Sequence, residues 1–219
     1  MATPYFQLRL ERVPSTQDVA RDRLAELPLL VMAREQSEGR GRSGAGWMTA
    51  DRALAASIAW RDDGEDDRPF SLMAGVAAVR SIPESRLKWP NDVLMSGGKA
   101  GGILVERSAG VTVVGLGLNL WWPEAGEGMS ALYRSDPGGH AHLELGSLWG
   151  ANLMELLASD SWPVEDYRAA CATIGEDVVW EPDGTGRAVG IGDDGALLVE
   201  TSEGVQAIHS GAVRHVRPA

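Results

Sequence analysis

Two hydrophobic patterns alternate along the chain: apolar residues at helical spacing, and short continuous apolar runs. The helical spacing predicts a first helix over Ser15–Leu27, where a capping-box pattern from Ser15 to Asp18 opens the helix and Pro28 closes it. The same spacing marks three later segments: Phe70–Ile82, about four turns from Leu143, and the stretch that holds Tyr167, Ala170, Cys171 and Ile174.

The short apolar runs predict strands. Leu29–Arg34 and Leu54–Trp60 each form one such run, and Leu87–Leu120 is a series of runs broken by the turns PND, SGG and AG. From Gly175 onward the runs are shorter and are separated by Asp-Gly and Glu-Gly turn pairs. The whole pattern predicts an α+β fold, with helices flanking a mixed sheet with antiparallel hairpins over residues 1–174 and a small β-barrel-like unit over residues 175–219.

Composition narrows the function classes. Acidic residues outnumber basic ones by 31 to 20 and give a formal charge of −11, which disfavours nucleic acid as a partner. The longest apolar stretches, such as Leu72–Val79, are shorter than the roughly 20 residues that a membrane helix needs. The N-terminal residues carry charges where a signal peptide has an apolar core. We therefore expect a cytoplasmic protein without a nucleic-acid or membrane partner.

Cysteine and histidine are scarce. The single cysteine, Cys171, excludes an internal disulfide and a cysteine metal cluster, and its helical spacing predicts a small core residue. The four histidines show no metal-ligand spacing, so no resident metal site is expected.

The rare lysines and asparagines are the first candidates for functional residues. Of the 20 basic residues all but Lys88 and Lys99 are arginine, and both lysines fall within the stretch RLKWPNDVLMSGGKAG. A compact ammonium suits phosphate contact in a confined site, although chance clustering also explains two residues. Asn91 lies in the same stretch and Asn119 ends the VVGLGLN run, while turn chemistry is a second explanation for Asn91.

The segment GRGRSG, Gly39 to Gly44, matches the dinucleotide-binding pattern G-x-G-x-x-G. Arginines stand where the backbone would approach a pyrophosphate, and the residues that follow predict a strand rather than a phosphate-binding helix. We interpret the segment as a mobile clamp, in which glycine gives flexibility and Arg40 and Arg42 offer donors to anionic oxygens. An exposed basic loop is the alternative. The clamp hypothesis predicts that residues 39–46 become ordered when an anionic ligand binds.

Taken together, these segments resemble the biotin protein ligase family, whose members make biotinyl-adenylate and pass biotin to a carrier-protein lysine. The resemblance rests on five motifs: the pair Ser15 and Thr16, GRGRSGAGW from Gly39 to Trp47, KWPNDV from Lys88 to Val93, KAGGILVE from Lys99 to Glu106, and GLGLN from Gly115 to Asn119. It implies a class II synthetase-like catalytic domain followed by a small SH3-like barrel. The Ser-Thr pair comes too early for an N-terminal helix-turn-helix, so no repressor role is expected.

The resemblance also implies roles for individual residues. Biotin would be held by Ser15, Thr16, Gln36, Gly39, Arg40, Arg42, Lys99, Gly102 and Gly115. ATP, carrying Mg²⁺, would contact Arg42, Trp47, Lys88, Asn91, Lys99 and Asn119. The catalytic groups would be Lys99, Arg40, Arg42 and Asp92. The protein partner would be the biotin carboxyl carrier protein domain of a biotin-dependent carboxylase, and a homodimer is left open.

The implied reaction asks for these residue types. The biotin carboxylate is already ionised at pH 7, so its attack on the α-phosphate needs cations rather than a general base. In the transfer step, a lysine amine with a reference pKa near 10.4 must lose a proton, and we assign Asp92 to position that amine. A backbone cap of the PND turn is the alternative role for Asp92.

Three other functions stay open on the sequence alone. A lipoate protein ligase shares the fold and the acyl-adenylate chemistry, but its RRxSGGG-type motif is replaced here by GRGRSG. A nucleotide-binding oxidoreductase would use GRGRSG as a dinucleotide loop. A noncatalytic binding module would explain the eight tryptophans.

Overall fold

The protein is described by a computed structural model that covers residues 4–44, 46–47, 50–182, 184–209, 211 and 213–216. Within these residues a seven-stranded sheet has the order β1-β2-β3-β7-β6-β5-β4. Its strands are β1 (Phe6–Val13), β2 (Leu29–Gln36), β3 (Arg52–Arg61), β4 (Arg86–Lys88), β5 (Asp92–Met95), β6 (Gly98–Ser108) and β7 (Val111–Trp121). The pair β1–β2 is parallel and the other pairs are antiparallel, which confirms the predicted mixed sheet.

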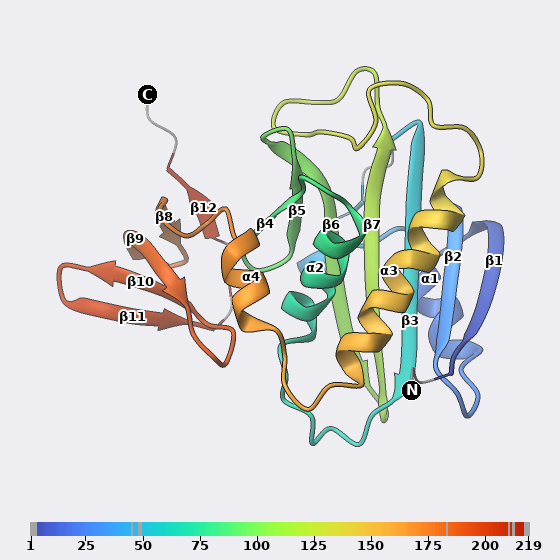
Figure 1. The fold of residues 1–219 in the computed structure, drawn as a ribbon, viewed down its shortest axis with the longest axis horizontal. Coiled ribbons are helices and arrows are strands. Elements are labelled where there is room, and N and C mark those ends of the chain that lie inside the picture. The colour runs from blue at the N-terminus through green and yellow to red at the C-terminus, as the bar shows by residue number, and fades with distance from the viewer. Residues whose placement is uncertain are drawn as a thin grey trace.

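Helices cover both faces of this sheet (Figure 1). They are α1 (Thr16–Asp22), α2 (Phe70–Ser81), α3 (Ala141–Leu157) and α4 (Val164–Ala170). Strand side chains alternate between the faces, so Leu30 and Met32 join the larger core with α2 and α3, whereas Leu29 and Val31 pack with Ala20 of α1. Because α1 is short, it covers only part of its face, and a ligand can reach the rest.

Two predicted helix boundaries differ from the structure. The first helix ends at Asp22 rather than Leu27, because the chain must leave it to bring Leu29 beside Phe6 in the parallel pair. The fourth helix ends at Ala170, before Cys171, which instead forms a bridge with Leu87. Cys171 is 2% exposed, as predicted for a small core residue.

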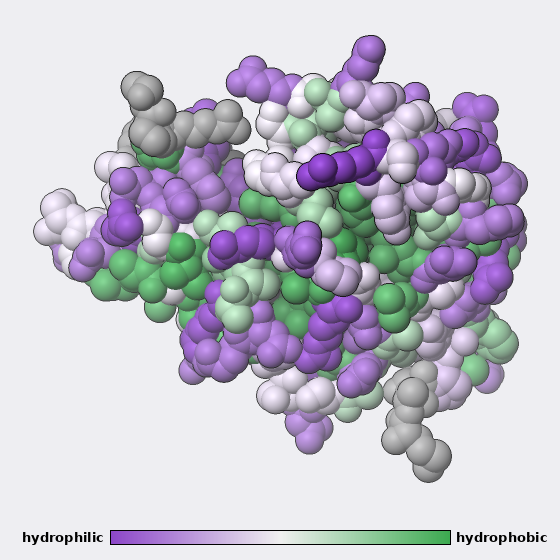
Figure 2. Space-filling model, turned by 45° about the horizontal axis from the view of Figure 1, so that its top comes forward, coloured by the Kyte–Doolittle hydropathy of each residue, from purple (hydrophilic) through white to green (hydrophobic). Residues whose placement is uncertain are grey.

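The C-terminal residues form a separate five-stranded antiparallel sheet within the described part of the chain, as predicted. Its strands are β8 (Asp177–Trp180), β9 (Gly184–Ile191), β10 (Leu197–Thr201), β11 (Gly204–Ile208) and β12 (Val213–His215), in the order β11-β10-β9-β8-β12. It lies beside β4 at the left of Figure 1. Figure 2 shows hydrophobic residues at the surface over this sheet as well as at the centre of the same face. Val189 of β9 and Val205 of β11 are exposed.

This second sheet is joined to the KWPND segment. The indole Nε1 of Trp89 donates to the backbone oxygen of Gly195 at 3.0 Å, and the Trp89 backbone N–H donates to Thr173 Oγ1 at 3.0 Å. His215 of β12 lies 3.1 Å from the same Thr173 hydroxyl. The β-rich unit therefore supports the segment that carries Asn91 and Asp92.

His215 makes this junction sensitive to pH. Burial, followed by the nearby charge of Lys88, lowers the pKa of His215. A histidine whose pKa is lowered by folding favours the folded state above about pH 6.5, and this contribution is lost as the pH falls through the lowered pKa. We expect the melting temperature to fall between pH 7.5 and pH 5.5 by about 2 °C more in the wild type than in His215→Gln. Scanning calorimetry checks this, with His209→Gln as the control; equal pH dependence in all three proteins contradicts it.

Candidate active site

A pocket of about 510 Å³ lies on the sheet face that α1 covers only in part. Its floor comes from the central strands β3, β6 and β7, whose small residues leave room above the sheet. Register places Ala55 and Gly102 beside Gly117, and Ser57 and Leu104 beside Gly115. The alternating residues of β7, Leu116 and Leu118, belong to the core below. The pattern GLGLN thus makes an open surface on one face of the strand and a packed core on the other.

Trp47 covers part of this glycine floor. A methyl group at Gly117 would lie 3.0 Å from the Trp47 indole, and one at Gly102 would lie 3.2 Å from it. The chain also holds Trp47 through its backbone N–H, which donates to the oxygen of Gly39 at 3.0 Å. These glycines are therefore required for the close approach of the indole, which gives the pocket an aromatic wall for a flat ligand group.

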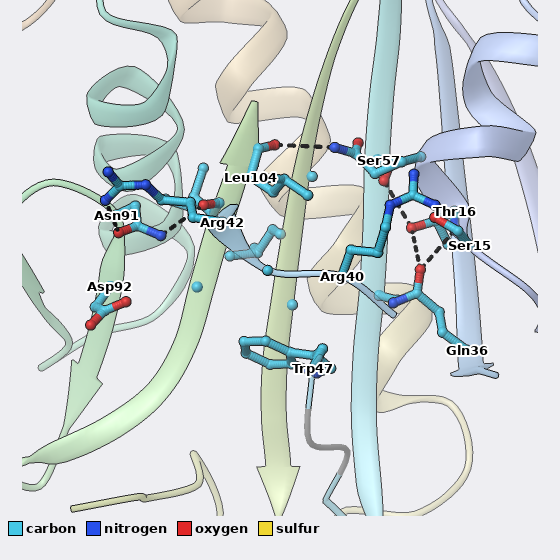
Figure 3. A pocket seen from close by; sticks show the side chains of 18 of the residues that line it. Ser15, Thr16, Gln36, Arg40, Arg42, Trp47, Ser57, Asn91, Asp92 and Leu104 are labelled. Atoms are coloured by element: carbon cyan, nitrogen blue, oxygen red, sulfur yellow. Dashed lines mark hydrogen bonds between the residues drawn. The ribbon is translucent and has the colours of Figure 1, made fainter. Parts of the chain in front are cut away.

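Polar groups from α1, β2 and β3 form one end of the pocket, at the right of Figure 3. The Thr16 backbone N–H and hydroxyl donate to Gln36 Oε1 at 2.7 and 3.0 Å, and the Thr16 hydroxyl lies 2.8 Å from Ser57 Oγ. Ser15, at the N-cap of α1, lines the same end, although its side chain makes no capping bond. Among the described residues, Gln17 Oε1 is buried without a hydrogen-bond partner. This end offers a ligand both donors and acceptors.

Charged groups lie across the pocket. Lys99 Nζ is 2.6 Å from Asp92 Oδ1, and these side chains are 33% and 19% exposed. The Lys99 backbone is fixed by two bonds to the loop after β7: its N–H donates to Gly128 O at 2.8 Å, and its oxygen accepts from Ser130 N at 2.9 Å. A fixed backbone limits where the ammonium can reach, so Lys99 is suited to meet an anion at one place in the pocket.

The two arginines of the glycine-rich segment have different partners. Arg42 donates to Asn91 Oδ1 and to the Gly211 backbone oxygen, both at 3.2 Å, and so joins the segment to the PND turn and to the C-terminal residues. Arg40 makes a two-bond pair with Asp18 of α1, at 2.7 and 2.8 Å, and lies 3.6 Å from Glu106. The hydrogen bond from Arg40 lowers the pKa of Asp18 and keeps that carboxylate ionised.

Arg40 therefore fastens the glycine-rich segment to α1, and we expect this contact to control its opening. Replacing Asp18 with Asn removes the charge that pairs with Arg40, so backbone amides of residues 39–44 should exchange about three- to tenfold faster in the free protein. Hydrogen exchange with mass spectrometry measures this. Asp22→Asn, an exposed position on the same helix, is the control; unchanged exchange in Asp18→Asn contradicts the expectation.

Eleven of the predicted site residues line the pocket and three do not. The lining residues are Ser15, Thr16, Gln36, Arg40, Arg42, Trp47, Asn91, Asp92, Lys99, Gly102 and Gly115. Gly39 packs against the side chain of Trp47, which a methyl group at Gly39 would approach to 3.2 Å. Lys88 of β4 pairs with Asp92 in the sheet register. Asn119 is fully buried; its Nδ2 donates to Ser130 O at 3.2 Å, and Oδ1 has no partner among the described residues.

Sequence reasoning missed several lining residues. Gln17 directly follows the Ser-Thr pair, and Gly117 alternates with Gly115, so neighbour and strand spacing could have found both. Ser57 alternates with Ala55 inside a predicted strand and interrupts a run of apolar residues. Glu181 and Gly211 come from the C-terminal unit, and nothing in the sequence pattern places them here.

The dinucleotide-loop interpretation of GRGRSG can be tested by this geometry. Within the described residues, GRGRSG itself ends in a single 3₁₀ turn over Arg42–Gly44 and the next element is β3, so the segment opens no helix of the dinucleotide-binding kind. No group of three or more histidine, cysteine, aspartate or glutamate residues in the described chain could hold a metal ion. None of the described helices is long and apolar enough to cross a membrane.

Comparisons with known proteins agree with this architecture. Residues 10–120 match the biotin/lipoate A/B protein ligase family, and residues 182–216 match the biotin protein ligase C terminal domain. The biotin--[acetyl-CoA-carboxylase] ligase of Mycobacterium tuberculosis is 32% identical over 222 residues, which cover 86% of this chain and 79% of that protein. The bifunctional ligase/repressor BirA of Bacillus subtilis is 27% identical, over 84% of this chain and 65% of that protein.

Solved structures show the same fold. The biotin protein ligase of Aquifex aeolicus, in complex with biotin and ATP, superimposes with a TM-score of 0.81 at 26% identity and covers 96% of this chain and 99% of that one. The family match spans half of the chain and the mycobacterial relative is matched over most of both lengths. The chain therefore belongs to the biotin/lipoate A/B protein ligase family, and its C-terminal unit is that of the biotin protein ligases.

Proposed function

We propose that the chain activates biotin with ATP to biotinyl-5′-adenylate and transfers the biotinyl group to a lysine of a carrier protein. The observation that carries this assignment is the division of the pocket into two ends. A hydrogen-bonding end around Thr16 and Gln36 faces a charged end around Lys99, with a glycine floor and Trp47 between them. A ligand with a polar ring, a short apolar stretch and a carboxylate matches this order of polar, apolar and charged surfaces along the pocket.

The polar end favours biotin over lipoate. The cyclic urea of biotin has two N–H donors and one oxygen acceptor, whereas the dithiolane of lipoate has no hydrogen-bond donor. Gln17 Oε1 is a buried acceptor that needs a donor, and leaving it unpaired costs about 1–3 kcal/mol. A urea can satisfy that oxygen and a dithiolane cannot. We assign Ser15, Thr16 and Gln36 to the urea, and the backbone at Gly115 to the space beside it. Gly39 and Gly102, which contact Trp47, are assigned to the part of the biotin site nearer that indole.

In the first half-reaction the biotin carboxylate oxygen attacks the α-phosphorus of ATP, and the bond to the β-phosphate breaks to release pyrophosphate. Two anions approach each other, so positive charge must be concentrated where they meet. Lys99 and Arg42 lie in the pocket and are assigned to this task, with Arg40 holding the glycine-rich segment over it. We place ATP against Trp47 and Asn91, with Lys88 near its phosphates. Asn119 is fully buried, so we assign it to act on this part of the pocket through its bond to Ser130 rather than by touching ATP. Mg²⁺ arrives with ATP as part of that substrate.

In the second half-reaction the carrier's lysine nitrogen attacks the acyl carbon, the bond to the phosphate oxygen breaks, and AMP and a proton leave. The amine must be neutral to attack, and we assign Asp92 to orient it and accept the proton.

The carrier is proposed to be the biotin carboxyl carrier protein domain of a biotin-dependent carboxylase. The protein is proposed to act in the cytoplasm, without nucleic acid as a partner; a homodimer is compatible with this function. Residues 1–174 are proposed as the catalytic domain and 175–219 as the SH3-like unit.

Pyrophosphate exchange tests the assignment. We expect the purified protein to exchange labelled pyrophosphate into ATP only when biotin is present. Lipoate at the same concentration should give no exchange above background. Exchange that depends on lipoate instead, or no exchange with either acid, contradicts the proposed function.

A further inference from the structure

Ser57 is a buried polar residue that the assignments above leave without a role. It lies in β3 and is 1% exposed, and its hydroxyl is 2.8 Å from that of Thr16. We propose that Ser57 is a positioning residue, which holds Thr16 and Gln36 in the one hydrogen-bonding arrangement that accepts the urea of biotin. This inference rests on the proposed function.

The hydrogen-bond distances determine where each proton lies. The Thr16 backbone N–H is 2.7 Å from the Gln36 side chain, so the oxygen of that amide must face it. The same oxygen has no proton and lies 3.0 Å from the Thr16 hydroxyl, which must therefore donate. Thr16 has then used its only hydroxyl proton, and in the contact with Ser57 the serine has to be the donor. The chain of donors runs from Ser57 through Thr16 to Gln36.

This order fixes what remains for a ligand. Gln36 Oε1 accepts two bonds from Thr16, so its NH₂ group is turned away from Thr16 with both protons free of that contact. The Ser57 oxygen has given its proton and keeps its lone pairs. A methyl group at Gly115 would lie 3.1 Å from Ser57 Oγ and 3.0 Å from Gln17 Oε1, so glycine keeps the space beside both oxygens open. Donor and acceptor positions at this end are therefore set before a ligand enters.

The surroundings of Ser57 give its hydroxyl no other use. The neighbouring residues on the same face of β3, Ala55 and Ala59, are apolar, and the strand pairs with β2 and β7 through its backbone. Thr16 is the one partner recorded for the Ser57 side chain within the described residues. If the hydroxyl served only to attach α1 to the sheet, removing it would change stability and leave ligand discrimination as it is.

The first measurement is the binding of biotin to Ser57→Ala by calorimetry. Without the serine donor the Thr16 hydroxyl can rotate away from Gln36, whose side chain is then held by the Thr16 backbone N–H alone. We expect biotin binding to weaken about three- to tenfold, the range for one neutral hydrogen bond. The KM for ATP and the exchange rate at saturating biotin should stay within about twofold of the wild type. Ser81→Ala, a buried serine of α2 outside the pocket, is the control and should bind biotin normally.

A pair of variants of matched shape separates the hydroxyl from packing. Ser57→Thr keeps the hydroxyl donor, whereas Ser57→Val has a methyl group in its place. Threonine and valine have the same shape and are both suited to a strand. If Ser57→Ala folds poorly, the same ratio of affinities is expected between these two variants. Equal biotin affinities for the threonine and valine variants overturn the inference.

Two further binding experiments, a double variant and a second ligand, test whether Ser57 acts through Thr16 on the urea. In a Thr16→Val background, Ser57→Ala should weaken biotin binding less than twofold further, because its route through Thr16 is gone. Desthiobiotin, which has the urea but no sulfur ring, should lose affinity for Ser57→Ala by the same factor as biotin. The role is contradicted if Ser57→Ala weakens biotin binding in the Thr16→Val background as much as it does in the wild type. It is also contradicted if Ser57→Ala binds desthiobiotin as tightly as the wild type does. If the wild type fails to bind biotin at all, the proposed function fails instead.

Discussion

Replacing Lys99 with alanine is expected to lower biotin-dependent pyrophosphate exchange about a hundred- to a thousandfold, with the fold unchanged. The ammonium is assigned to stabilise charge that develops between the carboxylate and the α-phosphate, and removing one such group from a preorganised site costs this much. The side chain is one-third exposed and its ion pair with Asp92 lies at the pocket surface, so the fold does not depend on it. Exchange at saturating substrates is the measurement.

The control for Lys99 lies on the same strand. Arg107 of β6 also pairs with a carboxylate, that of Asp62 at 2.7 Å, but lies outside the pocket. Arg107→Ala removes an equal charge and should leave exchange within about twofold. If Lys99→Ala retains near wild-type exchange, the ammonium does not take part in adenylation. If both variants lose exchange equally, the loss follows from net charge rather than from position.

The sequence predicted the inner strands and long helices because their patterns are strong. Phe70–Ile82 became α2 over Phe70–Ser81, and the run from Leu87 to Leu120 became four strands with turns at the expected places. The first strand, Phe6–Val13, was missed although Leu8 and Leu10 alternate with charged residues. It lies at the sheet edge, where one neighbour is solvent, so the charges that argued against an apolar segment are tolerated.

Most of the predicted site residues line one pocket, but the contacts between them could not be predicted from the sequence. The ordered motifs implied, through the family resemblance, that Ser15, Lys99 and Asn91 lie together, and all three line one pocket. The pairing of Arg40 with Asp18 depends on how α1 sits over the sheet, which no local pattern encodes. The contact from Lys99 to Asp92 arises because β5 and β6 are neighbours with an irregular register between Val93 and Leu94. Such tertiary contacts decide the electrostatics of the site.

Replacing Asp92 with asparagine is expected to slow biotin transfer from preformed adenylate to the carrier at least about a hundredfold, the usual contribution of a positioned general base. Pyrophosphate exchange should fall less than about tenfold, because a carboxylate near the α-phosphate does not assist the approach of two anions. Asparagine keeps the size of the side chain and its capacity to cap the PND turn. The change therefore removes the charge and the proton acceptor and little else.

The ion pair with Lys99 gives this experiment a second possible result. Asp92 lies 2.6 Å from the Lys99 ammonium, so its loss also frees the cation assigned to adenylation. If Asp92 acts only by holding Lys99, exchange and transfer should fall by the same factor, and the proposed role in transfer is wrong. If it accepts the proton, transfer alone should fall, and raising the pH toward the amine's reference pKa of about 10.4 should recover part of the rate. Asp166→Asn, which breaks a comparable ion pair with Arg80 outside the pocket, should leave both steps unchanged.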